Sequence, residues 1–192
     1  MRSRGLLLEK GTLVDATIIA APSSTENKDK ARDPEMHQTR KGKQYYFGAK
    51  AHIGADADSG LVHTVTATAA NVADITETAN LLHGQEEEVF ADAGYVGAEK
   101  REELKDREIK WHIAAKRSTV TGKEEGPLKD LTKTIEHLRA KIRARVEHPL
   151  HILKNLFGYR KVRYQGLKKN AAQFEVLFAL VNLVIAKKAL LA

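Results

Sequence analysis

The stretch "GTLVDATIIAA", residues 11–21, decides how the rest of the chain is interpreted. It is rich in Val, Ile and Thr and is bounded by Gly11 and Pro22, which is typical of a mostly buried β-strand. Asp15 lies at its centre, where a carboxylate has no helix or turn to cap. Burying an unpaired carboxylate is costly. A bound metal ion is one way to satisfy Asp15.

Composition indicates a compact globular protein. The 192 residues are 42% hydrophobic and 30% charged, which favours one domain with a sizeable core. The absence of cysteine excludes disulfides and thiolate metal sites and suits a reducing cytosol. Residues 1–10 hold too few consecutive apolar residues for a signal peptide. The apolar stretch 176–186 is shorter than the roughly 20 residues of a membrane span, so we expect a core helix and no membrane contact.

Further strands are predicted on both sides of a long loop. Residues 22–43 are polar and aperiodic, which indicates a surface loop. The stretches 44–55 and 60–70 flank the turn-forming "DADSG" and predict a hairpin. "EEVFADAGY" predicts a fourth strand with Asp92 near its end, and residues 110–116 predict a fifth.

Helices are expected mainly in the second half. Asp74 and Glu77 fit a capping box that opens a short helix through Leu82. From Leu128, apolar residues recur at amphipathic spacing, and Pro149 is expected to interrupt and kink that helix. The remaining predictions are a short helix over 97–107, a connector over 117–127, an exposed basic turn over 158–170 and a C-terminal helix over 171–191. The order predicts a mixed α/β fold.

Charge is distributed unevenly along the chain. Residues 71–110 hold eleven acids against five Lys and Arg, whereas residues 139–170 hold ten Lys and Arg against the single acid Glu147. A basic block of this kind is typical of polyanion binding. A solvated basic surface would give the same pattern.

Three acids could perform metal-assisted phosphodiester chemistry. Two hard cations need carboxylates converging from different elements, and Asp15, Asp92 and Glu147 could supply them. At roughly 100° per residue, Arg143 and Lys154 share a helical stripe with Glu147. That stripe could equally be a solvated salt-bridge row, and Asp92 could simply be a turn residue.

The motifs carrying these acids resemble those of a known family. "LVDATIIAAP", "VFADAGYVG" and "RARVEHPLHILKNLFGYRKVRYQGLKKN" are similar to the three acidic motifs of DDE transposases of bacterial insertion sequences, in the group around insertion sequences four and five. Arg143, Glu147 and Lys154 fit that group's Y-x2-R-x3-E-x6-K signature, although Ala140 stands at the Tyr position.

The resemblance implies a ribonuclease H-like mixed sheet flanked by helices, over a single domain spanning residues 1–192. It implies that Asp15, Asp92 and Glu147 bind two Mg²⁺ (or Mn²⁺) ions for strand cleavage and strand transfer. Partners would be transposon-end and target DNA, bound by a homodimer in the bacterial cytoplasm. The expected DNA contacts are Arg143, Lys154, Arg160, Arg163, Lys168 and Lys169.

Other residues keep two interpretations. Trp111 could stack on a flipped base or belong to the core, and His148 and His151 could support the site or lie on the surface. Family members usually carry a helical region before the first Asp, whereas here fourteen residues precede Asp15. We therefore expect a truncated chain that binds metal and DNA without transposing. A catalytically idle DNA-binding remnant that regulates full-length transposase, or a general nuclease of this fold, are the alternatives.

Overall fold

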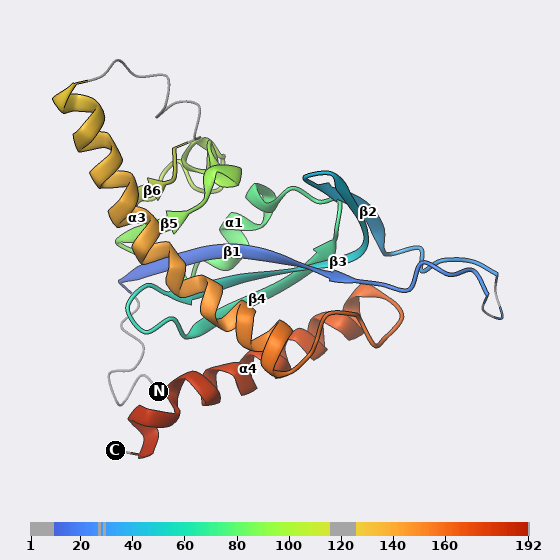
Figure 1. The fold of residues 1–192 in the computed structure, drawn as a ribbon. Coiled ribbons are helices and arrows are strands. Elements are labelled where there is room, and N and C mark those ends of the chain that lie inside the picture. The colour runs from blue at the N-terminus through green and yellow to red at the C-terminus, as the bar shows by residue number, and fades with distance from the viewer. Residues whose placement is uncertain (1–9, 27, 29, 116–125, 192) are drawn as a thin grey trace.

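A six-stranded mixed sheet forms the centre of the molecule (Figure 1). The computed structural model describes residues 10–26, 28, 30–115 and 126–191. Strand order is β2-β3-β1-β5-β6, and β4 pairs with β3. The strands are β1 (Gly11–Ala20), β2 (His37–Lys41), β3 (Gln44–Asp56), β4 (Val62–Ala69), β5 (Glu88–Ala91) and β6 (Lys110–Ile113).

The sheet changes from antiparallel to parallel at β1. β1 pairs with β3 in antiparallel register, Asp15 opposite Ile53, and β3 pairs in the same sense with β2 and β4. On its other side β1 runs parallel to β5, which runs parallel to β6. This mixed sheet flanked by helices is consistent with the ribonuclease H-like fold, so the predicted fold class is confirmed.

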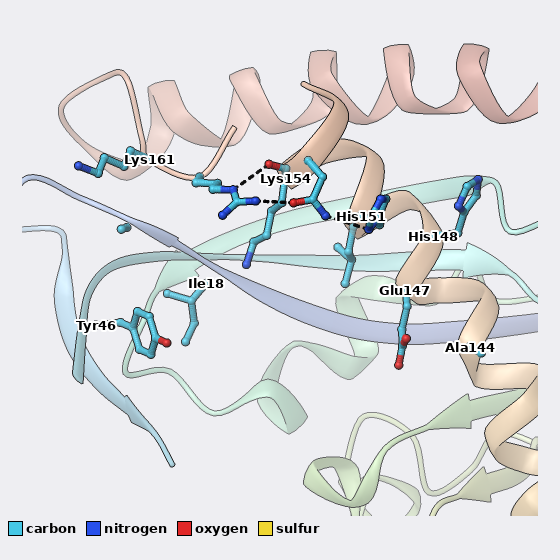
Figure 2. A pocket seen from close by; sticks show the side chains of 12 residues that line it. Ile18, Tyr46, Ala144, Glu147, His148, His151, Lys154 and Lys161 are labelled. Atoms are coloured by element: carbon cyan, nitrogen blue, oxygen red, sulfur yellow. Dashed lines mark hydrogen bonds between the residues drawn. The ribbon is translucent and has the colours of Figure 1, made fainter. Parts of the chain in front are cut away.

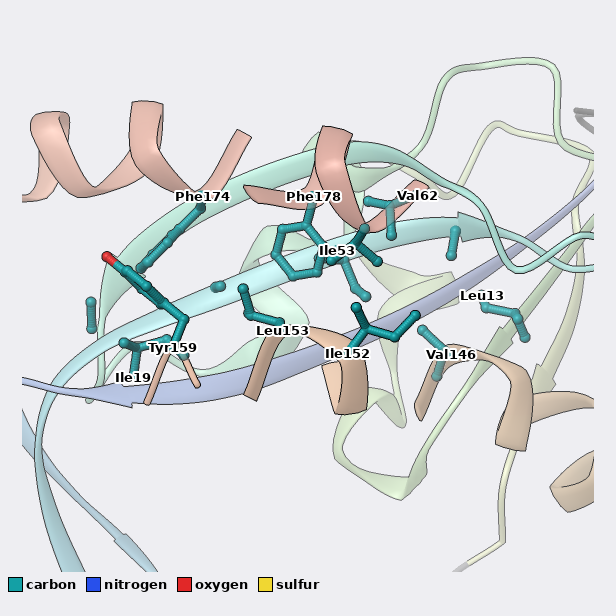
Figure 3. Packing of buried hydrophobic residues seen from close by; sticks show 14 of the residues in the cluster. Leu13, Ile19, Ile53, Val62, Val146, Ile152, Leu153, Tyr159, Phe174 and Phe178 are labelled. Carbon is teal, nitrogen blue, oxygen red and sulfur yellow. The ribbon is translucent and has the colours of Figure 1, made fainter. Parts of the chain in front are cut away.

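Two long helices cover one face of the sheet, and a short helix lies on the other (Figure 1). They are α3 (Pro127–His151), which continues into a π-helical turn (Ile152–Leu156), and α4 (Leu167–Leu191). The main core lies between these helices and the sheet, with Phe174 and Phe178 reaching toward the strands (Figure 3). A smaller core under the opposite face joins Val14 of β1 to α1 (Thr78–Leu81).

The expectation of a surface loop over residues 22–43 is wrong at its end, because His37–Lys41 form β2. β2 and β3 are joined by the two-residue turn Gly42–Lys43. Gly42 has a φ of 63°, while Lys43 has no positive φ. A glycine at the first turn position with a positive φ fits a type II′ turn, which matches the twist of the flanking strands.

Three further local expectations are corrected. Asp74 does not cap a helix, because its carboxylate accepts a hydrogen bond from Lys50 Nζ instead. Residues Asp74–Glu77 form a 3₁₀ turn before α1. The helix expected over 97–107 is reduced to a 3₁₀ turn at Ala98–Lys100. Pro149 lies inside α3, which continues to His151, because Pro149 is buried with Val146 and Ile152 against the sheet.

The second half of the chain differs in its details too. The expected basic turn over 158–170 is only partly exposed: Val162 is buried and donates its N–H to Ala20 O at 2.8 Å. The C-terminal helix begins at Leu167 rather than 171. The connector expected over 117–127 falls largely outside the described residues.

α4 is apolar along most of its length. Its segment Leu167–Lys187 is long and apolar enough to cross a membrane by length and composition, so the expectation that no such stretch exists is corrected. Phe174, Phe178 and Val181 on one face are at most 1% exposed against the sheet, as expected for a core helix. On the opposite face, Val176 is 57% exposed.

Candidate active site

Asp15 and Asp92 lie where the parallel part of the sheet ends. The parallel pairing of β1 with β5 extends to Leu13 opposite Phe90. Continuing that register by two residues places Asp92, which directly follows β5, beside Asp15. β1 itself continues to Ala20. β5 therefore ends beside the middle of β1. In open sheets with parallel strands, ligands bind in the crevice at the carboxyl ends of the strands.

Asp15 is a half-buried carboxylate in an unfavourable electrostatic environment. Its Oδ1 accepts a hydrogen bond from Ala16 N at 2.7 Å. The pKa of Asp15 is raised to about 6, chiefly by burial and to a smaller extent by the nearby Asp92 carboxylate, against the opposing effects of the Ala16 hydrogen bond and Arg143. A positive charge at this position would relieve both burial and repulsion.

Asp92 also has a local structural function. Its side chain accepts a hydrogen bond from Gly94 N at 2.8 Å and caps the 3₁₀ turn Ala93–Tyr95. The turn interpretation from the sequence therefore describes part of what Asp92 does. The carboxylate has a second oxygen, so the cap leaves an acceptor for another ligand.

Glu147 reaches the same side of the sheet from α3, which packs against β1 and β5. It lines a cavity of about 790 Å³, together with Lys154 (Figure 2). Arg143 is half-buried and lies close enough to Asp15 to affect its pKa. In the described part of the chain, no ion pair joins Glu147 to Arg143 or Lys154. The salt-bridge row that the sequence left open is therefore not formed.

The donor set suits a hard divalent cation. Asp15 and Asp92 offer only oxygen ligands, which Mg²⁺ and Mn²⁺ prefer, and the raised pKa of Asp15 indicates a site that lacks positive charge. Over the described residues, no three acids or histidines lie close enough together to hold one ion. Asp15, Asp92 and Glu147 therefore do not form a closed three-carboxylate site in this conformation.

The remaining predicted residues fall into two places. Arg160 and His148 line the same cavity as Glu147, and Arg160 donates from Nε to Lys154 O at 3.0 Å. Arg163 lies over the Tyr159 ring, 5.8 Å from its centroid. Lys168 and Lys169 are exposed in the first turn of α4. His151 lines the cavity, and Trp111 is half-buried against the smaller core on the other face.

A buried polar network beneath Asp15 was not foreseen. Lys50 Nζ donates to Asp74 Oδ1 at 2.8 Å, and His52, which is fully buried, lies 3.8 Å from the same oxygen through Nδ1. Burial lowers the pKa of His52. Asp74 lies close enough to raise the pKa of Asp15 as well. The signal available in the sequence was Lys50 itself, a charged residue inside a predicted strand.

Tyr95 lies close to the same carboxylates, and its buried hydroxyl has no hydrogen-bond partner among the described residues. It is 1% exposed, and burial, followed by Asp74, Asp15 and Asp92, raises its pKa. Its hydroxyl therefore stays protonated among carboxylates. The "DAGY" motif places Tyr95 three residues after Asp92, which was the only sequence signal for it.

Comparison with known families identifies the family of this chain. A family model described as "Transposase DDE domain" matches residues 7–183. The chain therefore belongs to the DDE transposase domain family, whose members are DNA-cleaving enzymes of transposition.

Proposed function

We propose that the chain is a metal-dependent DNA transposase of the group around bacterial insertion sequences four and five, which cleaves and joins DNA strands at insertion-sequence ends. The observation that carries this is the pairing of Asp15 and Asp92 at the step of the sheet, with a pKa of about 6 for Asp15. Two acids so placed, beside a cavity lined by Glu147 and cations, fit phosphodiester chemistry.

Asp15, Asp92 and Glu147 would hold two Mg²⁺ (or Mn²⁺) ions, Glu147 by moving toward the aspartates when DNA enters. The ions supply charge neutralisation for in-line attack by water and then by a DNA 3′-hydroxyl. The chain's own residues would compensate charge and bind phosphates. Arg143 offsets the negative charge of the acids, and Lys154 and Arg160 hold phosphates beside Glu147.

The test compares the chain with Asp92→Asn on labelled insertion-sequence-end DNA in Mn²⁺. Acid-dependent nicking followed by joining is the expected result, because removing one carboxylate removes a metal ligand. Binding without any acid-dependent cleavage would instead identify an idle remnant, which regulates full-length transposase. Hydrolysis of any DNA without joining would identify a general nuclease.

A further part of the proposal concerns the complete reaction. We propose that two chains act together on paired ends in the bacterial cytoplasm, which the mass of the DNA complex in solution tests.

A further inference from the structure

The β2–β3 hairpin stands opposite α3 across the cavity that contains Glu147. Tyr46 of β3 lines this cavity together with Ile18 of β1, while Lys154 and Arg160 line it from the α3 side (Figure 2). The residues predicted from the sequence to contact DNA include none on the hairpin side of this cavity. Its composition decides what could bind between the two walls.

Strand alternation determines which hairpin residues face the cavity. In the hairpin register Thr39 is opposite Tyr46, and Lys41 is opposite Gln44. Because side chains alternate along a strand and paired residues share a face, Lys41 lies on the same face as Tyr46. Arg40 and Tyr45 share the other face, where the Arg40 guanidinium lies 5.7 Å from the Tyr45 ring centroid.

Positive charges from both walls converge in this cavity. Burial, then the charges of Lys41 and Arg160, lower the pKa of Lys154, against a smaller opposing effect of the Asp15 carboxylate, so Lys41 lies within electrostatic reach across the cavity. Among described residues, none of these three cations forms an ion pair. Like charges brought together repel unless an anion lies between them. The bound form is therefore expected to contain that anion.

Tyr46 is held in place within this cavity. It is half-buried, and its hydroxyl donates to Gln44 Oε1 at 2.8 Å on the same strand. The ring is thus anchored at its hydroxyl end while it lines the cavity. Aromatic faces beside cations are the combination that binds single-stranded nucleic acid, through stacking and phosphate contacts.

We propose that the β2–β3 hairpin is a DNA clamp, in which Lys41 binds a backbone phosphate opposite Lys154 and Arg160 while Tyr46 stacks on an unpaired base next to it. This proposal rests on the proposed function, because it takes the strand leading to the Glu147 site as the ligand. Lys41 and Tyr46 are positioning residues, since neither lies among the three acids.

The test measures binding of the whole chain to fluorescein-labelled DNA of random sequence, single-stranded and duplex, in EDTA at several KCl concentrations. Lys41→Ala should weaken binding about fivefold and reduce the slope of log affinity against log salt by roughly 1, because one phosphate contact is lost. Lys41→Arg should restore both values. Lys100→Ala, which removes an exposed charge from the 3₁₀ turn Ala98–Lys100, is the matched control.

Tyr46 is tested on the single strand alone. Tyr46→Leu should weaken single-strand binding about fivefold, whereas Tyr46→Phe should retain it because the ring is kept. Equal thermal melting of all variants excludes unfolding as the cause. The clamp is overturned if Lys41→Ala has the affinity and salt slope of Lys100→Ala, or if Tyr46→Leu binds like the unaltered chain.

These measurements separate the clamp from the proposed function. Binding in EDTA requires no catalysis, so Lys41-dependent binding without Asp92-dependent nicking would support the clamp and contradict the transposase activity. If nicking depends on Asp92 but DNA binding is unaffected by substitution of Lys41 and Tyr46, the clamp alone is contradicted.

Discussion

At the scale of a single residue, Asp15 makes the free energy of unfolding depend on pH. Its pKa of about 6 in the folded chain lies above the ordinary value of 3.8, so the folded state holds this proton more tightly than the unfolded state. Asp15 therefore costs no stability below pH about 4, where it is neutral in both states. Its cost grows as the pH rises toward about 6 and is constant above that.

We expect Asp15→Asn to stabilise the metal-free chain at pH 8 by up to about 3 kcal/mol, the free energy equivalent of the pKa shift. The gain should disappear near pH 4. Urea unfolding in EDTA across this range measures it, with the exposed Asp106→Asn as control. A gain for Asp15→Asn that is independent of pH would contradict burial of an ionised carboxylate.

Single residues show what could be predicted from sequence and what could not. Asp15 could be identified because a carboxylate at a strand centre has no helix or turn to cap, although in the structure it does accept a hydrogen bond from Ala16 N. Asp74 could not, because Asp followed by Glu three positions later is typical of a helix cap. Its actual partners, Lys50 and His52, are more than twenty residues away in sequence and are brought close only by the fold.

At the scale of elements, α4 is fixed to the sheet by one side-chain amide. Asn182 Nδ2 donates to Val62 O at 2.6 Å, and Asn182 Oδ1 accepts from Val62 N at 2.8 Å. Among the described strands, β4 pairs only with β3. Without Asn182, the N–H and C=O of Val62 at the outer edge of β4 would therefore lack this hydrogen-bond partner. The amide therefore substitutes for a neighbouring strand.

We expect Asn182→Leu to destabilise the chain by about 2 kcal/mol, because it leaves a backbone donor and acceptor unpaired at a part-buried position. Leu183→Ala on the exposed side of α4 should change the free energy of unfolding by less than about 0.5 kcal/mol. Chemical denaturation of both variants measures the difference. Equal effects would show that the amide contributes nothing beyond α4 packing.

Elements with a buried face were predictable, and those without one were not. β1 and α3 carry apolar residues at strand and helix spacing, and both lie where they were expected. β2 was missed because four of its five residues are exposed, and the fifth is only half-buried. An edge strand of this kind has no hydrophobic alternation to detect. Its polar character is also what makes it suitable for the proposed clamp.

At the scale of the whole molecule, we propose that residues 1–192 form one domain. α3, α4 and the sheet share one continuous hydrophobic core, so heat should unfold them together. Calorimetry should show a single transition with equal calorimetric and van't Hoff enthalpies. Two resolved transitions would contradict a single domain.

The acids and the fold also predict how metal should change the stability of the whole chain. A cation bound only by the folded state stabilises it by about 2.7 kcal/mol at a concentration of a hundred times its dissociation constant, and Mn²⁺ should therefore raise the melting temperature at pH 8. The rise should shrink as the pH falls below about 6, because a proton on Asp15 competes with the ion.

Asp92→Asn should abolish most of this Mn²⁺-dependent rise in melting temperature, whereas Asp106→Asn should keep it. If Glu147→Gln retains the full rise, the two aspartates bind the ion without Glu147, in line with the absence of a three-carboxylate cluster among the described residues, and Glu147 joins them only with DNA. A melting temperature unchanged by Mn²⁺ at pH 8 would contradict the metal site itself.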